Sequence, residues 1–154
     1  MQIKRIFTIA ILILMLNSCS AIGNDPASSC PLTEAVWIKP PEDDAVSNPP
    51  AFGYYYTNDD ASIIASAWWV GQEEYPLRAS SEVVKVGWFR PEGAELTITG
   101  QRLDGDAPAL ESHVPCCYPT RFQATGLYFP TEGCWEGNAK AADKEINFIV
   151  WVEP

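Results

Sequence analysis

The chain has 154 residues, and its 20 Asp and Glu outnumber its 10 Lys and Arg, giving a formal net charge of −10. So acidic a surface repels phosphate groups, which argues against nucleic acid and anionic lipid head groups as partners. The length suits one domain with a single ordinary core.

The first 18 residues have the organisation of a secretory signal peptide. Lys4 and Arg5 precede an apolar run over residues 6–16. That run is too short for a membrane-spanning helix of about 20 residues but typical of a signal h-region. Residues 1–18 contain two basic residues and no acidic one, so their removal leaves 136 residues with a net charge of −12.

The sequence Leu16-Asn17-Ser18-Cys19 resembles a bacterial lipobox. The resemblance implies cleavage before Cys19 and thioether lipidation of Cys19, and several acyl chains such as palmitate anchor a protein stably to a membrane. We therefore expect an extracytoplasmic domain held at a bacterial membrane. In a host with two membranes, Ser20 lacks the Asp that resembles an inner-membrane retention signal, which implies the outer membrane. The alternative is an ordinary secretory signal in which Cys19 is incidental.

Residues 19–33 are small, polar and Pro-containing, and they predict a flexible tether behind the lipidated Cys19. Residues 34–154 form the predicted domain, in which Pro and Gly separate short runs of β-branched and aromatic residues. Runs at roughly 8–12-residue spacing, without a sustained helical period, are typical of a β-sandwich or barrel. The predicted strands cover residues 34–39, 52–57, 62–70, 82–89, 94–100, 126–130, 133–141 and 145–152.

Three of these segments allow more specific expectations. Asp60 could cap a helix that carries Ile64 and Trp68 on one face, but the Trp-Trp-Val end of residues 60–70 favours a strand. The turn at residues 92–95 predicts a hairpin between the strands on either side of it. In the last strand, period-two alternation places Ile146, Phe148, Val150 and Val152 toward the core and Trp151 on the opposite face.

The C-terminal half resembles an uncharacterised group of bacterial lipoproteins with an immunoglobulin-like β-sandwich. Residues 85–91 and 96–105 share the resemblance, which extends over about 84–152. The matching positions of the "LxFPxxGCWE" run are Leu127, Phe129, Pro130, Gly133, Cys134, Trp135 and Glu136. The resemblance implies an all-β, immunoglobulin-like antiparallel sandwich and brings no activity with it.

Four cysteines remain besides Cys19: Cys30, Cys116, Cys117 and Cys134. An exported protein forms lasting disulfides, and four cysteines allow three pairings that sequence cannot distinguish. Adjacent residues of a strand point to opposite faces, so we favour different partners for Cys116 and Cys117, one bonded to Cys134 and the other to Cys30. A vicinal Cys116–Cys117 bond is the strained alternative.

A second interpretation of "HVPCC" is a soft-metal or redox site formed by His113, Cys116 and Cys117. His113 is the single His of the chain, whereas a blue-copper site needs two, and no Cys-x-x-Cys pair is present. Structural disulfides are the commoner use of cysteines in small exported domains, so we predict no metal and no cofactor.

No catalytic motif is found in the sequence. A Gly-x-Ser-x-Gly elbow is absent, and His113 lies in a Pro-rich segment where we expect a surface position. Asp104 and Asp106 hint at a Ca²⁺ loop but lack its full pattern, so an Asp-Gly turn is the better interpretation.

Six Trp are many for this length. Trp88 and Trp135 are the predicted core residues, whereas one of Trp68 and Trp69 should face outward, as should Trp151. Exposed aromatic side chains of this kind stack on sugar rings or contact proteins. The tyrosines at residues 54–56 form a second possible site, although such rings often only cover each other.

The sequence thus predicts a non-enzymatic binding module at the cell envelope, with Trp68 and Trp69 as binding residues and an envelope protein or glycan as partner. The alternatives are an inhibitor of an envelope hydrolase and, less favoured, the metal or redox protein.

Overall fold

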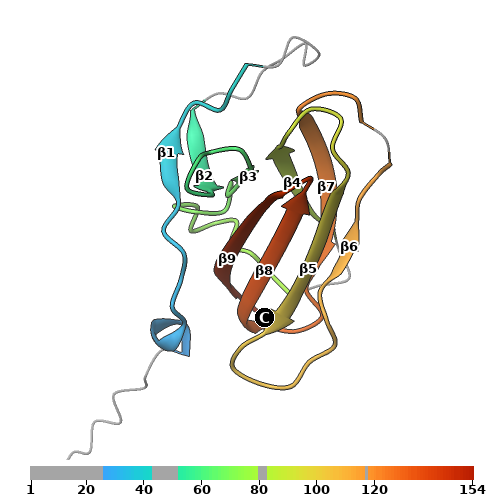
Figure 1. Cartoon of the computed structure of the whole chain (residues 1–154). Helices are drawn as coiled ribbons and strands as arrows, with labels where there is room; N and C mark the ends of the chain where they lie inside the picture. The colour runs from blue at the N-terminus through green and yellow to red at the C-terminus, as the bar shows by residue number, and fades with distance from the viewer. Residues whose placement is uncertain (1–25, 43–51, 80–82, 117) are drawn as a thin grey trace, which may run out of the picture.

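The computed structural model describes residues 26–42, 52–79, 83–116 and 118–154, and within these ranges the chain is all-β apart from one short 3₁₀ turn. Figure 1 shows two antiparallel sheets facing each other. The elements are η1 (Pro26–Ser29), β1 (Val36–Ile38), β2 (Gly53–Thr57), β3 (Ile64–Ser66), β4 (Val84–Phe89), β5 (Leu96–Arg102), β6 (Glu111–His113), β7 (Phe122–Tyr128), β8 (Gly133–Ala141) and β9 (Lys144–Val152).

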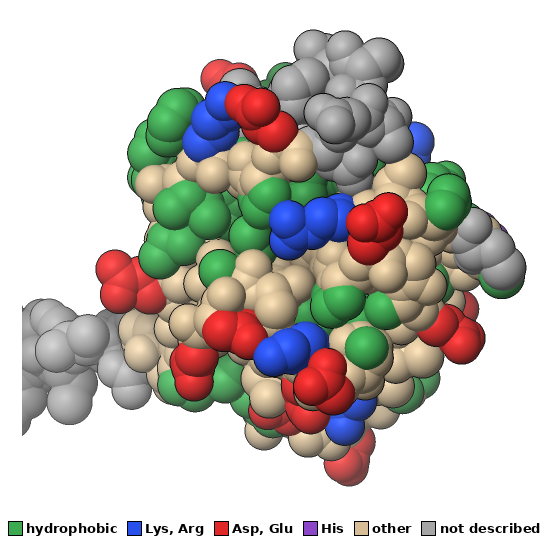
Figure 2. Space-filling model, turned by 45° about the horizontal axis from the view of Figure 1, so that its top comes forward, with side chains coloured by type: hydrophobic (Ala, Val, Ile, Leu, Met, Phe, Trp, Pro, Cys, Tyr) green, Lys and Arg blue, Asp and Glu red, His purple; other side chains and the backbone are tan. Residues whose placement is uncertain are grey.

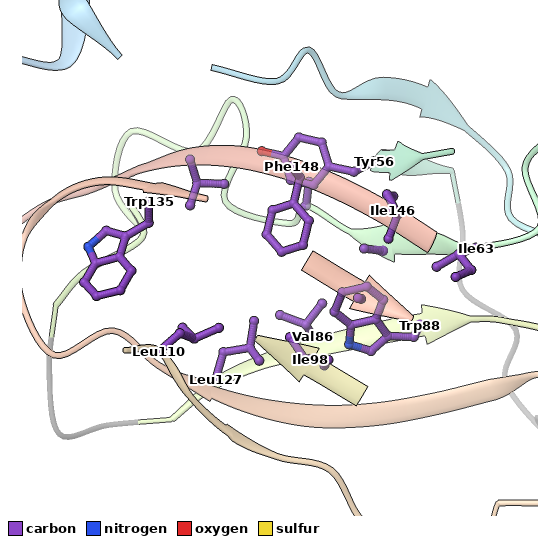
Figure 3. Packing of buried hydrophobic residues seen from close by; sticks show 14 of the residues in the cluster. Tyr56, Ile63, Val86, Trp88, Ile98, Leu110, Leu127, Trp135, Ile146 and Phe148 are labelled. Carbon is purple, nitrogen blue, oxygen red and sulfur yellow. The ribbon is translucent and has the colours of Figure 1, made fainter. Parts of the chain in front are cut away.

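The large sheet has the order β1-β2-β3-β4-β7-β6 and the small sheet the order β5-β8-β9. Their facing sides enclose the main core, where side chains from both sheets point toward one another (Figure 3). Trp88 on β4 and Trp135 on β8 are both fully buried, so the prediction that these two Trp belong to the core is confirmed.

The small sheet follows the predicted alternation. Ile146, Phe148, Val150 and Val152 of β9 are all buried, whereas Trp151 lies on the other face and is half-buried. β8 and β9 pair over their whole length and form a tight hairpin, in which Ala142 has a positive φ of 53°.

The hairpin predicted around residues 92–95 is wrong. β4 pairs with β7 in the large sheet, whereas β5 pairs with β8 in the small one. The turn between them, with Gly93 at φ 69°, therefore carries the chain from one sheet to the other. Turn residues look alike in both cases, because a hairpin and a crossing between sheets need the same reversal of direction.

Residues 60–70 form neither a helix nor a long strand. Asp60 does cap, but it caps a turn: its Oδ1 accepts a hydrogen bond of 3.1 Å from the backbone N–H of Ser62. The short strand β3 follows, and the chain turns again from Trp68 to Gly71, where φ is 76°. The strand thus ends before Trp68 and Trp69. These two residues lie in a turn, where their side chains make the contacts, instead of pairing with a neighbouring strand through the backbone.

The segment before β1 is attached to the body of the domain. Cys30 is bonded to Cys134 of β8 with 5.5 Å between the Cα atoms. The backbone N–H of Thr33 donates to the Ile149 carbonyl at 3.0 Å, and Thr33 Oγ1 accepts from the Ile149 N–H at 2.8 Å. Residues 26–33, expected to be tether, thereby cover part of the free edge of β9, an edge that would otherwise offer unpaired backbone groups. Residues 19–25 lie outside the described ranges.

Candidate functional site: an aromatic surface and groove

The β1–β2 end of the large sheet carries exposed aromatic side chains. Trp37 lies opposite Tyr54, and their rings meet edge to face with centroids 5.0 Å apart. Trp37 is 60% exposed and Tyr54 36%. Figure 2 shows hydrophobic side chains gathered at the left of that face, where β1 and β2 lie.

Of the three tyrosines of β2, only Tyr54 is exposed to solvent, and the alternation of side chains along the strand explains part of this difference. Tyr55 points to the outer face of the sheet and is buried against Ile64 and Phe89. Tyr54 and Tyr56 share the inner side. Tyr56 is buried and stacks on Phe148 of the small sheet at 5.4 Å, whereas Tyr54 lies two residues earlier in β2, opposite Trp37, and remains accessible.

The turn that follows β3 places the predicted Trp pair next to this edge. The backbone N–H of Ala67 donates to the Tyr54 carbonyl at 2.8 Å. The indole N–H of Trp68 donates to the Lys85 carbonyl at 2.8 Å, and so extends the β3–β4 contact beyond the end of β3. The Trp68 ring is 45% exposed, whereas Trp69 is half-buried and lies edge-on to Trp68 at 5.6 Å. The outward member of the pair is therefore Trp68. Trp37, Tyr54 and Trp68 are called the aromatic surface below.

Beside the aromatic surface lies a shallow groove of about 310 Å³ between the turn and the end of β9. The two indoles of Trp69 and Trp151 contribute to its walls, and Gly71, which also lines it, packs against the Tyr54 ring. We call it the Trp groove; it is lined by Trp69, Gly71, Gln72, Glu73, Pro76, Leu77, Trp151 and Glu153.

The lining of the Trp groove combines apolar rings with hydrogen-bond acceptors. Glu73, Glu153 and Gln72 supply carboxylate and amide groups next to the indoles. The Glu153 backbone is fixed by two hydrogen bonds of 2.7 Å, from its N–H to the Leu77 carbonyl and from the Ala79 N–H to its own carbonyl. Pre-formed apolar walls with a few placed polar groups are the usual composition of a small-ligand site.

The sequence analysis placed Trp37 in a strand but did not assign it to a site. A signal was present, because Trp37 lies in a short run directly before Pro40 and Pro41, and Pro is confined to edge strands and strand ends. An aromatic side chain on an edge strand has fewer neighbours to cover it.

The structure corrects the favoured disulfide pairing. Cys30 and Cys134 are bonded to each other, so neither can bond Cys116 or Cys117. Cys134 points away from the core while its neighbour Trp135 points into it, and the outer face is where the N-terminal segment lies. Cys116 is disulfide-bonded as well. Cys19 and Cys117 lie outside the described residues.

The residues of the alternative metal site have other surroundings. His113 is exposed at the end of β6, the strand at the opposite edge of the large sheet from β1. Within the part of the chain that the structure describes, no three His, Cys, Asp or Glu residues lie close enough to hold a metal ion. A disulfide sulfur such as that of Cys116 is also no thiolate ligand.

The Asp-Gly segment after β5 is a turn held by an ion pair. Arg102 Nε donates to Asp104 Oδ1 at 2.7 Å, and this hydrogen bond lowers the pKa of the Asp104 carboxyl. The pair packs on Gly133, where φ is 130° and an added Cβ would lie 2.5 Å from Arg102 Nε. Gly133 is thus required both for its backbone conformation and for the close approach.

No protein-family model and no curated protein matches the sequence. Among solved structures the chain is similar to a candidate lipoprotein from Bacillus anthracis, with 15% sequence identity, a TM-score of 0.44, and coverage of 78% of this chain and 88% of that one. A likeness at this level carries no inference about function. In the described ranges, no helix is both long and apolar enough to cross a membrane.

Proposed function

We propose that this chain is a lipid-anchored binding module of the bacterial cell envelope, that it is not an enzyme, and that it recognises a neutral glycan with the aromatic surface and the Trp groove. The observation that carries the proposal is that two aromatic pairs, each with an exposed ring, adjoin the groove. Tyr54, paired with Trp37, packs on Gly71 of the groove lining, and Trp68 packs on Trp69, which lines the groove together with Trp151.

The chemistry of this region favours a sugar. Flat aromatic faces offer apolar contact to sugar rings, and the carboxylates of Glu73 and Glu153 can accept hydrogen bonds from hydroxyl groups. These carboxylates and the acidic chain as a whole disfavour a polyanionic polymer. The single His lies at the opposite edge of the large sheet, away from the groove, which agrees with binding without catalysis.

Export is supported by the signal sequence and by the Cys30–Cys134 bond, because such bonds persist in oxidising compartments. Lipidation of Cys19 would hold the domain close to the bilayer. Cys30 lies 11 positions after Cys19, and a fully extended chain over 11 steps spans at most about 36–40 Å. Cys30, where the domain begins to attach to this segment, would therefore lie within that distance of the membrane surface.

We also propose that the fold is immunoglobulin-like. In that architecture, strands A, B, E and D form one sheet and strands C, F and G the other. The orders β3-β4-β7-β6 and β5-β8-β9 correspond to these two sheets, with β1 and β2 added beside strand A. Trp37 and Tyr54 of the aromatic surface would then lie on an extension that the basic sandwich lacks.

The test is binding of the mature protein, made soluble by Cys19→Ser, to neutral cell-wall polysaccharides and to peptidoglycan fragments by isothermal titration calorimetry. We expect Trp37→Ala and Trp68→Ala each to weaken glycan binding by about tenfold or more, since aromatic anchors dominate such interfaces. Leu103→Ala is the control, because Leu103 is 44% exposed but lies outside both the aromatic surface and the groove.

A blank screen, or glycan binding that both Trp variants leave unchanged, would contradict the proposal. Tight inhibition of a lysozyme or protease by a protein that binds no glycan would instead favour the inhibitor hypothesis.

A further inference from the structure

A second cavity lies away from the Trp groove, between the turn that follows β4 and the segment that precedes β7. Its volume is about 560 Å³, within the range of small-ligand sites. The wall contains Arg90, Leu96, Val114, Pro115, Tyr118 and Gln123. Arg90 and Gln123 are only 1% and 2% exposed, so a charged side chain and an amide line this cavity from within the protein.

Among the described residues, all the acceptors that bond Arg90 are neutral. Nε donates to Gln123 Oε1 at 2.8 Å, and Nη2 donates to the Tyr118 carbonyl at 3.1 Å. Nη1 donates to the Pro91 carbonyl at 3.0 Å and, more weakly, to the Thr120 carbonyl at 3.4 Å. These four bonds use four of the five N–H groups of a guanidinium.

Gln123 completes the arrangement, since its Nε2 donates to the Pro115 carbonyl at 2.6 Å. The two side chains thus hold Pro115, Tyr118 and Thr120 in place, and Pro115 and Tyr118 line the cavity. Holding these residues in place explains the four hydrogen bonds of Arg90. It does not explain the positive charge, because a neutral donor can form hydrogen bonds to the same acceptors without burying a charge.

Comparison with Arg102 shows what Arg90 lacks. Arg102 is less buried and has a carboxylate partner, Asp104, at 2.7 Å, whose hydrogen bond raises the pKa of Arg102. For Arg90, burial lowers the pKa and no carboxylate of the described residues forms an ion pair with it. Glu95 lines the same cavity but is exposed. A guanidinium stays charged in a protein, and a buried charge is stable only when it is compensated.

We propose that the cavity binds the carboxylate of a small organic acid with an apolar body, such as an N-acyl amino acid, with Arg90 as its counter-ion. The carboxylate accepts the fifth N–H of Arg90 and can take over the N–H of the long Thr120 bond. The apolar body packs on Leu96, Val114 and Pro115. This site is independent of the proposed glycan function.

The experiment compares carboxylates with their matched neutral amides on the Cys19→Ser protein. The probes are acetate, hexanoate and N-acetyl-L-leucine, and the controls are acetamide, hexanamide and N-acetyl-L-leucinamide. Binding is followed by the thermal midpoint and by NMR shifts. We expect N-acetyl-L-leucine to bind with a Kd of roughly 1 mM, as fits a ligand of its size, and its amide to bind at least tenfold more weakly.

Two variants separate binding from folding. Arg90→Gln removes the charge, but it also removes the hydrogen bonds to Tyr118 and Thr120 and could prevent folding. Ala94→Trp fills the cavity and leaves Arg90 in place, since Ala94 lines the same space. Ala94→Trp should abolish binding of N-acetyl-L-leucine, whereas Trp68→Ala should leave it unchanged.

Three results would overturn the proposal: no carboxylate of the panel binds, acid and amide bind equally, or Ala94→Trp binds like the parent protein. None of these bears on glycan binding, so failure of one proposal is distinguishable from failure of the other.

Discussion

The small sheet and the β1–β3 end of the large sheet differ in strand length and in how far their faces are buried. Strands β5, β8 and β9 have 7, 9 and 9 residues, and the core-facing side chains of β8 and β9 are buried from Trp135 to Ala141 and from Ile146 to Val152. Strands β1, β2 and β3 have 3, 5 and 3 residues, and the inner face of the outermost pair is exposed at Trp37 and Tyr54. The long strands provide the stability, and the short ones provide accessible aromatic rings.

The largest expected contrast is between a Trp of each region. Trp135→Ala should lower the free energy of unfolding by about 3–5 kcal/mol, because it empties a fully buried site. Trp68→Ala should cost about 1 kcal/mol, since it removes one hydrogen bond from a half-exposed ring. Urea unfolding of both variants measures the difference, and equal losses would show that Trp68 is a core residue instead of a surface one.

The attachment of the N-terminal segment comes next. Replacing both Cys30 and Cys134 by Ala should reduce stability by about 2–4 kcal/mol, because the bond joins residues 104 positions apart and constrains the unfolded chain. Thr33→Val is the matched control. It removes only the side-chain contact with the Ile149 N–H and should cost about 1 kcal/mol. If Thr33→Val destabilises as much as the loss of the disulfide, packing of residues 26–33 and not the cross-link holds the segment.

Each region also contains one turn with an Ala in the left-handed conformation. Ala142 in the β8–β9 turn and Ala61 in the β2–β3 turn both have φ of 53°. Left-handed backbone costs a non-Gly residue about 1–2 kcal/mol, part of which Gly loses again through its larger unfolded-state entropy. Ala142→Gly and Ala61→Gly should therefore each stabilise by about 0.5–1 kcal/mol in thermal or urea unfolding. Destabilisation by either change would mean that the methyl group makes a contact that outweighs the strain.

The smallest effect concerns an ion pair that joins the two regions. Lys144 Nζ donates to Asp60 Oδ2 at 2.7 Å, and this bond, followed by those from Ser62, holds the pKa of the Asp60 carboxyl well below its ordinary value of 3.8. A depressed folded-state pKa gives stability that is fully present above pH 3.8 and is lost as the pH falls below it.

Asp60→Asn should consequently lower the thermal midpoint slightly at neutral pH, and its difference from the parent protein should shrink as the pH falls below about 4. Thermal scans from pH 7 to pH 2.5 give the comparison. A difference that stays constant over this range would mean that the carboxyl charge of Asp60 is irrelevant to stability.

The same division explains what the sequence could and could not predict. In β9 the alternation of Ile146, Phe148 and Val150 follows directly from burial of one face, so pattern and structure agree. The turn around Gly93 exists, but the predicted pairing of the two strands beside it is wrong, because a local pattern does not determine which sheet the next strand joins. Trp68 and Trp69 were assigned to a strand on composition, although contacts with Lys85 and Tyr56 decide their place.

For the candidate site, the sequence named Trp68 and Trp69 and noted the tyrosines. It missed the groove because Trp69, Trp151 and Glu73 come together only through packing of β9 against the turn. The sequence also did not predict that Arg90 is buried, because no sequence pattern marks a charged residue between a strand and a turn as buried.

The measurement that tests the central claim, an exported, lipid-anchored and disulfide-bonded module, is mass spectrometry of the protein purified from its host after non-reducing proteolysis, with free thiols blocked at harvest. We predict an N-terminal peptide that begins at Cys19 and carries acyl chains, and a peptide with Cys30 joined to the peptide with Cys134. An unmodified Cys19 within an uncleaved chain, together with a free thiol on Cys30, would contradict it.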